Sequence, residues 1–211
     1  MIKILIADDH AIVREGLKQI VAEENDMKVS GEASNVNELF VLLKNEKWNI
    51  VVLDINMPGK SGLEALKDIK IQFPDLPVLV LSMFSEELYG MRSLKAGASG
   101  YLKKVSAPTE LVNAIRMIVA GKKYISAGLA QNLATDMAND SKPATHFILS
   151  DREYQIMCDI ATGKSAEEIA AELSLSIHTV YTYRNRILEK LKLRSNVDIT
   201  QYAIKNKLIE I

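Results

Sequence analysis

The first 120 residues alternate short apolar runs with amphipathic helical patterns, and this alternation restricts the fold more than any other feature of the chain. Apolar runs such as Ile4–Ala7 and Ile50–Leu53 have the length and continuity of strands that are buried on both faces. Helical patterns cover roughly residues 11–24, 35–46, 61–73, 86–96 and 108–120. Strands and helices that alternate in this way form a parallel sheet covered on both faces. We therefore predict an α/β doubly wound domain with five parallel strands.

Carboxylates follow two of these apolar runs at the point where each predicted strand ends. Asp8 and Asp9 come directly after the run that ends at Ala7, and Asp54 comes directly after the run that ends at Leu53. In a doubly wound sheet the carboxyl ends of the strands form the ligand crevice, and clustered carboxylates there can hold a hard divalent cation. The sequence therefore predicts a Mg2+ site built around a candidate nucleophile.

Two later apolar runs bring further polar side chains to the same end of the sheet. Residues 77–81 deliver Ser82, and residues 98–102 deliver Lys104. A carboxylate nucleophile, a metal ion, a hydroxyl group and an ammonium group are the components of a phosphoryl-transfer site. In this interpretation Asp54 attacks in line and acquires the phosphoryl group, while Mg2+ and Lys104 neutralise the phosphoryl oxygens.

The order and spacing of these residues resemble those of the receiver domain of bacterial two-component response regulators. The matching segments are Asp8-Asp9, Asp54 followed by Met57-Pro58-Gly59 and Gly62, Ser82, Gly97-Ala98-Ser99-Gly100-Tyr101, and Lys104. The resemblance implies a CheY-like fold with strand order 2-1-3-4-5 and phosphorylation by a sensor histidine kinase. It further implies that Asp54 is the phosphoacceptor, that Mg2+ is held by Asp8, Asp9, Asp54 and the main-chain carbonyl of Asn56, that Ser82 and Tyr101 form the switch pair, and that Lys104 binds the phosphoryl group.

Some assignments near this site have alternatives. Lys103 and Lys104 are adjacent, so they point to opposite faces of a strand, and the family spacing of three residues after Tyr101 selects Lys104. Tyr101 is also compatible with an ordinary core aromatic residue. His10 is interpreted as a helix-start residue rather than a metal ligand, because Mg2+ prefers oxygen ligands.

The composition is that of an ordinary globular chain, with 48% hydrophobic and 25% charged residues among 211. No apolar run approaches the roughly 18 residues of a transmembrane helix, and the first residues lead into a strand rather than a signal peptide. We therefore expect a cytoplasmic protein with no membrane partner. Cys158 is the only cysteine, which excludes an intrachain disulfide, and we interpret it as a small buried residue on a helix.

The strand pattern ends at Ala120, and a polar stretch follows. We predict a receiver domain at residues 1–120, a linker at 121–145 and a small all-α helix-turn-helix domain at 146–211. Within the linker we expect flexibility over at least residues 138–145 and a short helix around 129–137.

Two helix starts in the last region have the form of a capping box. They are Ser150 with Glu153 and Ser165 with Glu168. In a capping box the serine side chain accepts a hydrogen bond from the backbone amide of the glutamate, and the glutamate side chain accepts one from the backbone amide of the serine. Both glutamates are therefore interpreted as structural. A helix of about eight residues, the turn Leu173–Ser176 and a longer basic helix then form the helix-turn-helix.

The longer helix has one apolar and one polar face. At 100° per residue, an apolar stripe is predicted that contains Val180, Ile187, Leu188 and Leu191. Arg184 falls within this stripe, so its stem is expected to be buried, and contact of its charged end with a DNA phosphate stays open. Residues 184–194 hold five cations against one acid. The polar face is suited to enter a major groove. Its candidate base readers are Tyr181, Thr182 and Asn185, and its candidate phosphate contacts are Thr179, Arg186, Lys190 and Lys192.

This region resembles the LuxR-type DNA-binding domain. The matching segments are Leu149-Ser150-Asp151-Arg152-Glu153, Ile169-Ala170, Thr179-Val180, Ile187-Leu188-Glu189-Lys190-Leu191 and Arg194-Ser195. Together the two resemblances place the chain among NarL/FixJ-type response regulators, which implies binding to promoter DNA and a homodimer on activation. One departure is that Tyr181 and Tyr183 stand where the family commonly has Lys and His. Because Tyr cannot make the bidentate contact to guanine that a cation makes, the target sequence is expected to differ.

The combined hypothesis is a phosphorylation-switched transcriptional regulator that performs phosphoryl chemistry only on itself. A metal-dependent phosphatase is the first alternative, but it leaves the basic helix unexplained. A DNA-binding protein with a vestigial receiver is the second, and the complete set of acceptor, metal pair, hydroxyl and lysine disfavours it.

Overall fold

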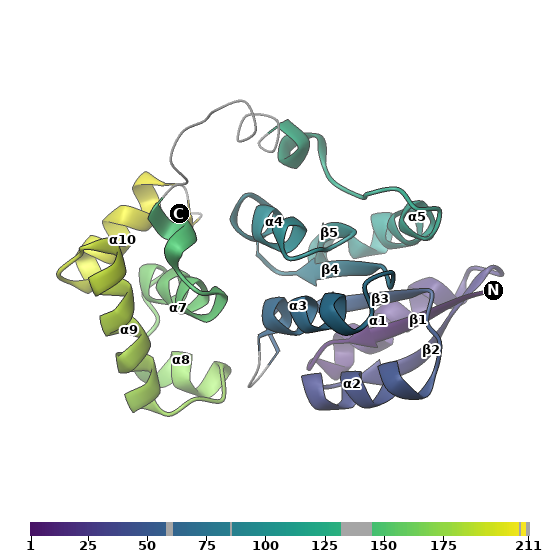
Figure 1. The fold of residues 1–211 in the computed structure, drawn as a ribbon, viewed down its shortest axis with the longest axis horizontal. Coiled ribbons are helices and arrows are strands. Elements are labelled where there is room, and N and C mark those ends of the chain that lie inside the picture. The colour runs from purple at the N-terminus through teal and green to yellow at the C-terminus, as the bar shows by residue number, and fades with distance from the viewer. Residues whose placement is uncertain (58–60, 85, 132–144, 207, 210–211) are drawn as a thin grey trace. The chain divides into compact units, whose positions relative to one another are not determined.

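The computed structural model describes residues 1–57, 61–84, 86–131, 145–206 and 208–209. The chain divides into two compact units, Met1–Met137 and Ala138–Ile211, which are described separately below. The first unit is α/β and the second is helical (Figure 1). Among the described residues, no helix is both long and apolar enough to cross a membrane.

The first unit alternates strands and helices along its length. Its strands are β1 (Ile2–Ala7), β2 (Met27–Ala33), β3 (Ile50–Asp54), β4 (Val78–Ser82) and β5 (Gly100–Lys103). Its helices are α1 (Ala11–Ala22), α2 (Val36–Asn45), α3 (Gly62–Gln72), α4 (Glu86–Lys95) and α5 (Ala107–Val119), with a 3-10 turn at Lys104–Ser106.

The strands form one parallel sheet in the order β2-β1-β3-β4-β5, which confirms the predicted order. In the register of the ladder, Ala7 pairs with Leu53 and Asp54 pairs with Leu81. Asp8, which follows Ala7, and Ser82, which follows Leu81 and ends β4, therefore lie at the same end of the sheet as Asp54. This register places the candidate site along the carboxyl edge of the three central strands.

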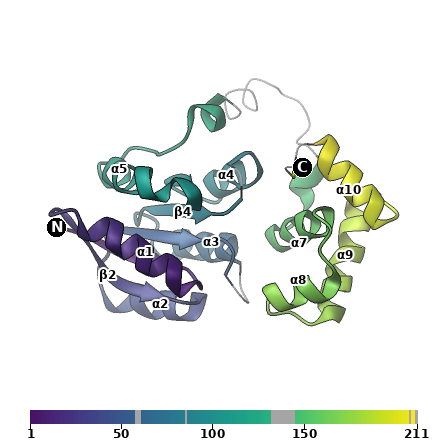
Figure 2. The ribbon, with the colours of Figure 1, turned by 180° about the vertical axis from the view of Figure 1, so that it is seen from behind.

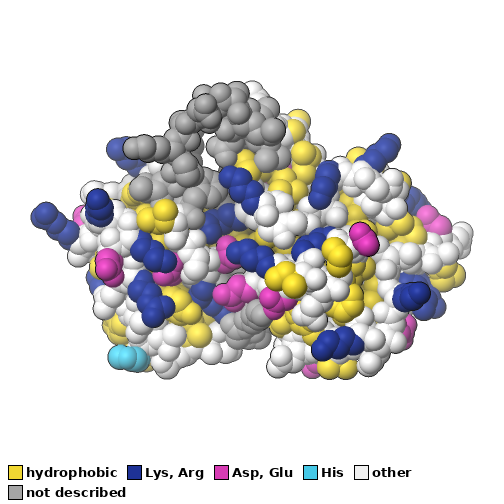
Figure 3. All heavy atoms as spheres, in the orientation of Figure 1, with side chains coloured by type: hydrophobic (Ala, Val, Ile, Leu, Met, Phe, Trp, Pro, Cys, Tyr) yellow, Lys and Arg dark blue, Asp and Glu magenta, His cyan; other side chains and the backbone are white. Residues whose placement is uncertain are grey.

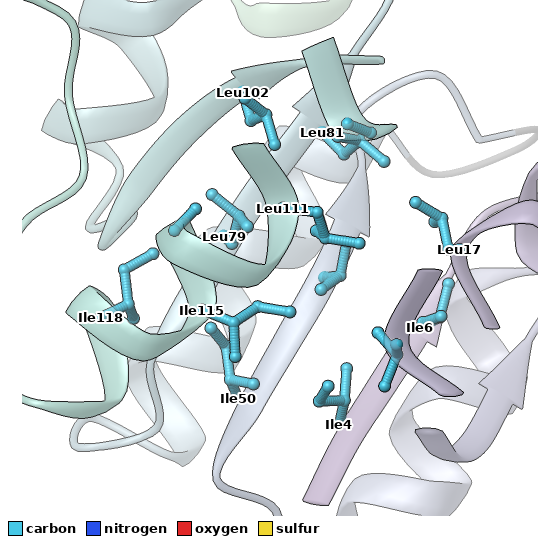
Figure 4. Close-up of a cluster of buried hydrophobic side chains, with 14 of the residues drawn as sticks. Ile4, Ile6, Leu17, Ile50, Leu79, Leu81, Leu102, Leu111, Ile115 and Ile118 are labelled. Carbon is cyan, nitrogen blue, oxygen red and sulfur yellow. The ribbon is translucent and has the colours of Figure 1, made fainter. Parts of the chain in front are cut away.

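A hydrophobic cluster between the sheet and the pair α1 and α5 forms one half of the core. Ile4, Ile50 and Leu79 extend from the strands toward Leu111 and Ile115 of α5 (Figure 4). Figure 2 views the molecule from this side, with α1 and α5 in front of the sheet. Because α2, α3 and α4 cover the other face, the central strands are buried on both sides, and this explains their continuous apolar sequences.

The second unit contains only helices among its described residues. They are the 3-10 turn η2 (Thr145–Ile148), α7 (Asp151–Ala161), α8 (Ala166–Glu172), α9 (Ile177–Leu191) and α10 (Asn196–Lys205). Both predicted capping boxes are present, at Ser150 with Glu153 and at Ser165 with Glu168. Helices α8 and α9 form the helix-turn-helix, and Ser174 in the turn between them has a φ of 51°.

The predicted domain boundaries stay a prediction. The expected flexible segment 138–145 lies almost entirely outside the described residues, and so does most of the expected helix at 129–137. Residues 127–131 are helical, so a helix begins slightly before the predicted position.

Candidate functional site: an acidic pocket and a polar helix

The acidic pocket lies where β1 and β3 end. Asp8 and Asp54 are each only 1% exposed, and Asp9 is half-buried. Oxygen atoms of these three carboxylates and a ring nitrogen of His10 all lie within 4.8 Å of one another. Three carboxylates at this separation repel one another strongly in a buried site, so the pocket requires cationic partners.

Lys104 is one such partner. Its Nζ lies 2.8 Å from Oδ2 of Asp54 and 2.6 Å from Oδ2 of Asp8. Burial acts to lower the pKa of Lys104, but the interactions with Asp54 and Asp8 outweigh it and raise the pKa above its ordinary value. The structure thus directs Lys104 into the pocket, whereas Lys103, still on β5, lines a separate hollow with Glu86 and Glu110.

Asp54 has a perturbed pKa. Burial raises the pKa of its carboxyl group, the charge of Lys104 opposes that rise, and the charge of Asp8 adds to it. The other carboxylate oxygen, Oδ1, accepts a hydrogen bond of 3.0 Å from the amide of Asn56. Asp54 is therefore a desolvated carboxylate held in place from both sides.

His10 occupies the N-cap position of α1, as the sequence predicts, but its side chain does not cap the helix. The ring nitrogen Nδ1 instead lies 2.8 Å from Oδ1 of Asp9 and 3.3 Å from Oδ1 of Asp8. The sequence shows only that His10 follows Asp8 and Asp9, and it does not predict that the ring contacts their carboxylates.

The donor set of the pocket fits a hard divalent cation. Carboxylate oxygens from Asp8, Asp9 and Asp54 are the ligands that Mg2+ prefers, and they converge within 4.8 Å. One lysine does not balance three carboxylates, so a divalent cation would neutralise the remaining charge. The acidic pocket is therefore suited to a metal ion.

Ser82 and Tyr101 are connected through the peptide groups of Phe84. The amide of Phe84 donates to Oγ of Ser82 at 3.1 Å, and the hydroxyl of Tyr101 donates to the carbonyl of Phe84 at 3.0 Å. Tyr101 is 2% exposed, so its ring lies inward, and the ring of Phe84 stacks on that of Tyr89. The sequence identified Ser82 and Tyr101 but missed Phe84, because its backbone groups make the connection.

In the second unit, the polar face of α9 carries the candidate DNA-binding residues. Tyr181, Asn185 and Arg186 are exposed, with Tyr181 at 49%. Thr182 is half-buried, and its hydroxyl donates to the carbonyl of His178 at 3.0 Å. On the face viewed in Figure 3, cationic side chains are interspersed with acidic ones.

Several cations of this region already have partners within the second unit. Nζ of Lys190 lies 2.6 Å from Oε2 of Glu153, so this ion pair joins α9 to α7. Nε of Arg184 donates to Oδ1 of Asn196 at 2.6 Å and so joins α9 to α10. Neither contact was expected from the sequence, because both partners come from other helices.

Comparison with known proteins identifies both units. Residues 4–116 match the response regulator receiver domain, and residues 148–203 match the luxR family of bacterial regulatory proteins. The chain belongs to the response regulators. It is of the NarL/FixJ type, with a receiver domain and a LuxR-type DNA-binding domain.

Relatives of this response regulator match it over nearly their whole length. The response regulator UvrY of Escherichia coli K12 is 37% identical over 99% of this chain and 96% of its own. The oxygen regulatory protein NreC of Staphylococcus epidermidis is 37% identical over 99% of each chain. Among solved structures, RcsB of Salmonella enterica bound to promoter rprA with the phosphomimetic BeF3− has 26% identity and a TM-score of 0.66, covering 95% of this chain and 97% of its own.

Proposed function

We propose that Asp54 accepts a phosphoryl group from a sensor histidine kinase, and that its phosphorylation controls dimerisation and DNA binding. The observation that supports this most is the placement of Asp54, which is 1% exposed between the ammonium of Lys104 and the carboxylates of Asp8 and Asp9. The proposed site of action is the bacterial cytoplasm, and the proposed partners are the kinase, promoter DNA and a second copy of the chain.

In the proposed reaction, a carboxylate oxygen of Asp54 attacks the phosphorus of the kinase phosphohistidine. The phosphorus–nitrogen bond breaks as the acyl phosphate forms, and the histidine leaves with the electron pair. Lys104 lies close enough to Asp54 to pair with a phosphoryl oxygen, and the Asn56 amide holds the carboxylate in place. Hydrolysis of the same acyl phosphate would end the signal. Both the transfer of the phosphoryl group and its hydrolysis would therefore take place on Asp54 of the regulator itself.

Asp8, Asp9, Asp54 and the carbonyl of Asn56 are the proposed ligands of Mg2+. When bound, the metal would neutralise developing negative charge on the phosphoryl group. The residues of the chain would then have distinct tasks: the acids would hold the metal, and Lys104 would bind the phosphoryl group.

The proposed switch combines several contacts, because one is too weak. Moving a two-state equilibrium from 1:99 to 99:1 requires about 5.5 kcal/mol, whereas one hydrogen bond to a charged group contributes about 1.5–3 kcal/mol. Ser82 and Lys104 would both bind the phosphoryl group. Because Phe84 connects Ser82 to Tyr101, a shift of Ser82 would favour the inward position of Tyr101.

For the DNA-binding domain, we propose that Tyr181, Thr182 and Asn185 contact bases. Thr179, Arg186, Lys190 and Lys192 would contact phosphates, and binding by Lys190 would require it to leave Glu153. A two-fold dimer would bind an inverted repeat with half-sites about one helical turn apart, or a multiple of it.

The experiment that tests the acceptor is intact-mass spectrometry after incubation with acetyl phosphate and Mg2+. The unmodified chain should gain about 80 Da, the mass of one phosphoryl group, on Asp54. Asp54→Asn and Asp9→Ala should gain nothing, whereas Asp75→Asn, which changes an exposed acid of the same domain, should be labelled normally. Labelling of Asp54→Asn would show that the nucleophile is another residue.

A further inference from the structure

The segment that leaves α5 does not depart from the receiver. Residues 123–129, which we call the strap, follow α5 (Figure 1, the teal segment between α5 and the grey trace), and Tyr124 forms a parallel bridge with Gly100 of the edge strand β5. The amide of Tyr124 donates to the carbonyl of Ser99 at 3.0 Å, and the amide of Tyr101 donates to the carbonyl of Tyr124 at 3.2 Å. The strap thus satisfies backbone groups that an edge strand would otherwise expose.

Side chains of the receiver hold the strap from both flanks. The hydroxyl of Tyr124 donates to the carboxylate of Glu110 on α5, and the amide of Ser126 donates to Oε1 of Glu86 on α4 at 3.1 Å. Burial, with the contact to Glu110, raises the pKa of Tyr124 to about 12. The strap is therefore bound to α4, β5 and α5 together.

Two glycines allow this close approach. A Cβ at Gly100 would lie 2.7 Å from the carbonyl oxygen of Tyr124, and a Cβ at Gly90 would lie 2.8 Å from a methyl group of Leu129. Leu129 is 2% exposed, so its side chain is buried against the receiver. These contacts are as close as packing in a domain core, which is unlike a flexible linker.

A hollow of about 310 Å³ is lined both by residues of the strap and by Tyr101. Its lining includes Tyr101, Glu86, Glu110 and Tyr124, so the residues that hold the strap also border the proposed switch residue. With Tyr101 inward and bonded to Phe84, the hollow stays open and the strap is docked. An outward rotamer of Tyr101 would turn the ring into this space and against Tyr124.

We propose that the strap senses the rotamer of Tyr101. The strap is docked while Tyr101 is inward. An outward Tyr101 displaces Tyr124 from Glu110, and the strap loosens. Phosphorylation of Asp54, which favours the inward ring, therefore tightens the strap. The chain continues from the strap to the DNA-binding domain, so docking of the strap fixes the point at which the chain leaves the receiver. This inference rests on the proposed function, because it uses Tyr101 as the switch.

Hydrogen exchange of the full chain, followed by mass spectrometry of the peptide covering residues 122–131, tests the proposal. After acetyl phosphate and Mg2+, exchange of this peptide should slow roughly tenfold, the effect of about 1.4 kcal/mol. Intact mass is measured on the same sample. If Asp54 is fully phosphorylated and exchange is unchanged or faster, the proposal is wrong while the proposed function stands.

Variants separate the strap from phosphorylation itself. Tyr124→Phe removes the donor to Glu110 and should make the peptide exchange roughly tenfold faster in the phosphorylated protein, with normal labelling of Asp54. Gly100→Ala should loosen the strap in both states, whereas Gly16→Ala, whose Cβ meets nothing within 4 Å, is the matched control. If Gly100→Ala does not fold, the exchange rate of the strap peptide in Tyr124→Phe decides whether the proposal holds.

Tyr101→Phe tests the coupling without any phosphoryl group. This variant cannot donate to the carbonyl of Phe84, so the outward rotamer should gain population and the strap should exchange several-fold faster. Unchanged exchange in Tyr101→Phe would overturn the coupling, even if Asp54 proved not to be the acceptor.

Discussion

Replacing Asp54 with Asn should stabilise the metal-free protein, although it removes an ion pair. At an effective dielectric constant of about 20, the attraction between Asp54 and Lys104 at 2.8 Å is about 6 kcal/mol. The carboxylates of Asp8 and Asp9, no more than 4.8 Å away, each repel Asp54 by at least about 3.5 kcal/mol. Attraction and repulsion therefore nearly cancel, and the cost of burying a carboxylate that is 1% exposed decides the sign.

Asn at position 54 keeps the shape of the side chain and an oxygen that can accept from the Asn56 amide, and Asp8 remains as a partner for Lys104 at 2.6 Å. The free energy of unfolding should rise by about 1–3 kcal/mol, which corresponds to roughly 3–10 °C in Tm for a unit of this size. This direction agrees with the raised pKa of Asp54, which indicates that the folded protein disfavours its ionised form.

The assay is scanning calorimetry at pH 7 in EDTA and again in Mg2+. Metal binding should stabilise the unmodified chain more than Asp54→Asn, so the difference in Tm should shrink or reverse when Mg2+ is added. Asp75→Asn should change Tm little in either buffer, because Asp75 is exposed. A lower Tm for Asp54→Asn in EDTA would refute the reasoning, because it would mean that Lys104 more than compensates for burial and repulsion.

Three further outcomes are expected. Lys190→Ala should lower the stability of the DNA-binding domain by about 1–2 kcal/mol at pH 7. Burial acts to raise the pKa of its partner Glu153, but the contacts with Lys190 and Ser150 outweigh burial and lower the pKa below its ordinary value of about 4.5. The ion pair therefore persists at pH 7, and calorimetry should show the loss disappearing as the pH falls from about 4.5 through this lowered pKa. Lys192→Ala should keep the stability but reduce the salt slope of DNA binding by about 0.9, whereas Asn185→Ala should cost about 1–3 kcal/mol on the operator alone, both measured by fluorescence anisotropy. Ser82→Ala should still gain about 80 Da from acetyl phosphate but show a smaller phosphorylation-dependent rise in DNA affinity.

The acidic pocket was accessible to sequence reasoning because its geometry follows from the sheet. Once β1 and β3 are recognised as buried parallel strands, the residues after them must meet at one edge, and this brings Asp8 and Asp54 together. The position of Lys104 required more, since strand alternation alone did not choose it over Lys103. The 3-10 turn that starts at Lys104 ends the strand at this point, and the side chain reaches Asp54 from there.

The contacts of α9 were less accessible because helical periodicity describes a single helix. It correctly places Val180, Ile187 and Leu191 on the buried face, whereas Leu188, predicted on the same stripe, is only half-buried. It cannot show that Lys190 pairs with Glu153, which lies 37 residues earlier in the sequence. The distance between these two side chains depends on how α9 packs against α7. A cation on the polar face therefore looks equally available for DNA whether or not a neighbouring helix supplies an acid.

The strap was hidden from the sequence for a different reason. Most of residues 121–145 are polar or small, and such a composition is typical of linkers. The contacts that dock the strap are backbone hydrogen bonds at Tyr124 and close approaches at Gly90 and Gly100, and neither kind leaves a periodic pattern of side chains. The large apolar or aromatic residues of this segment are Tyr124, Ile125, Leu129, Leu133 and Met137. Of these, Tyr124 and Leu129 make the docking contacts described above. Because an exposed tyrosine or leucine costs a linker little, two such residues indicate docking only when the surface that receives them is known.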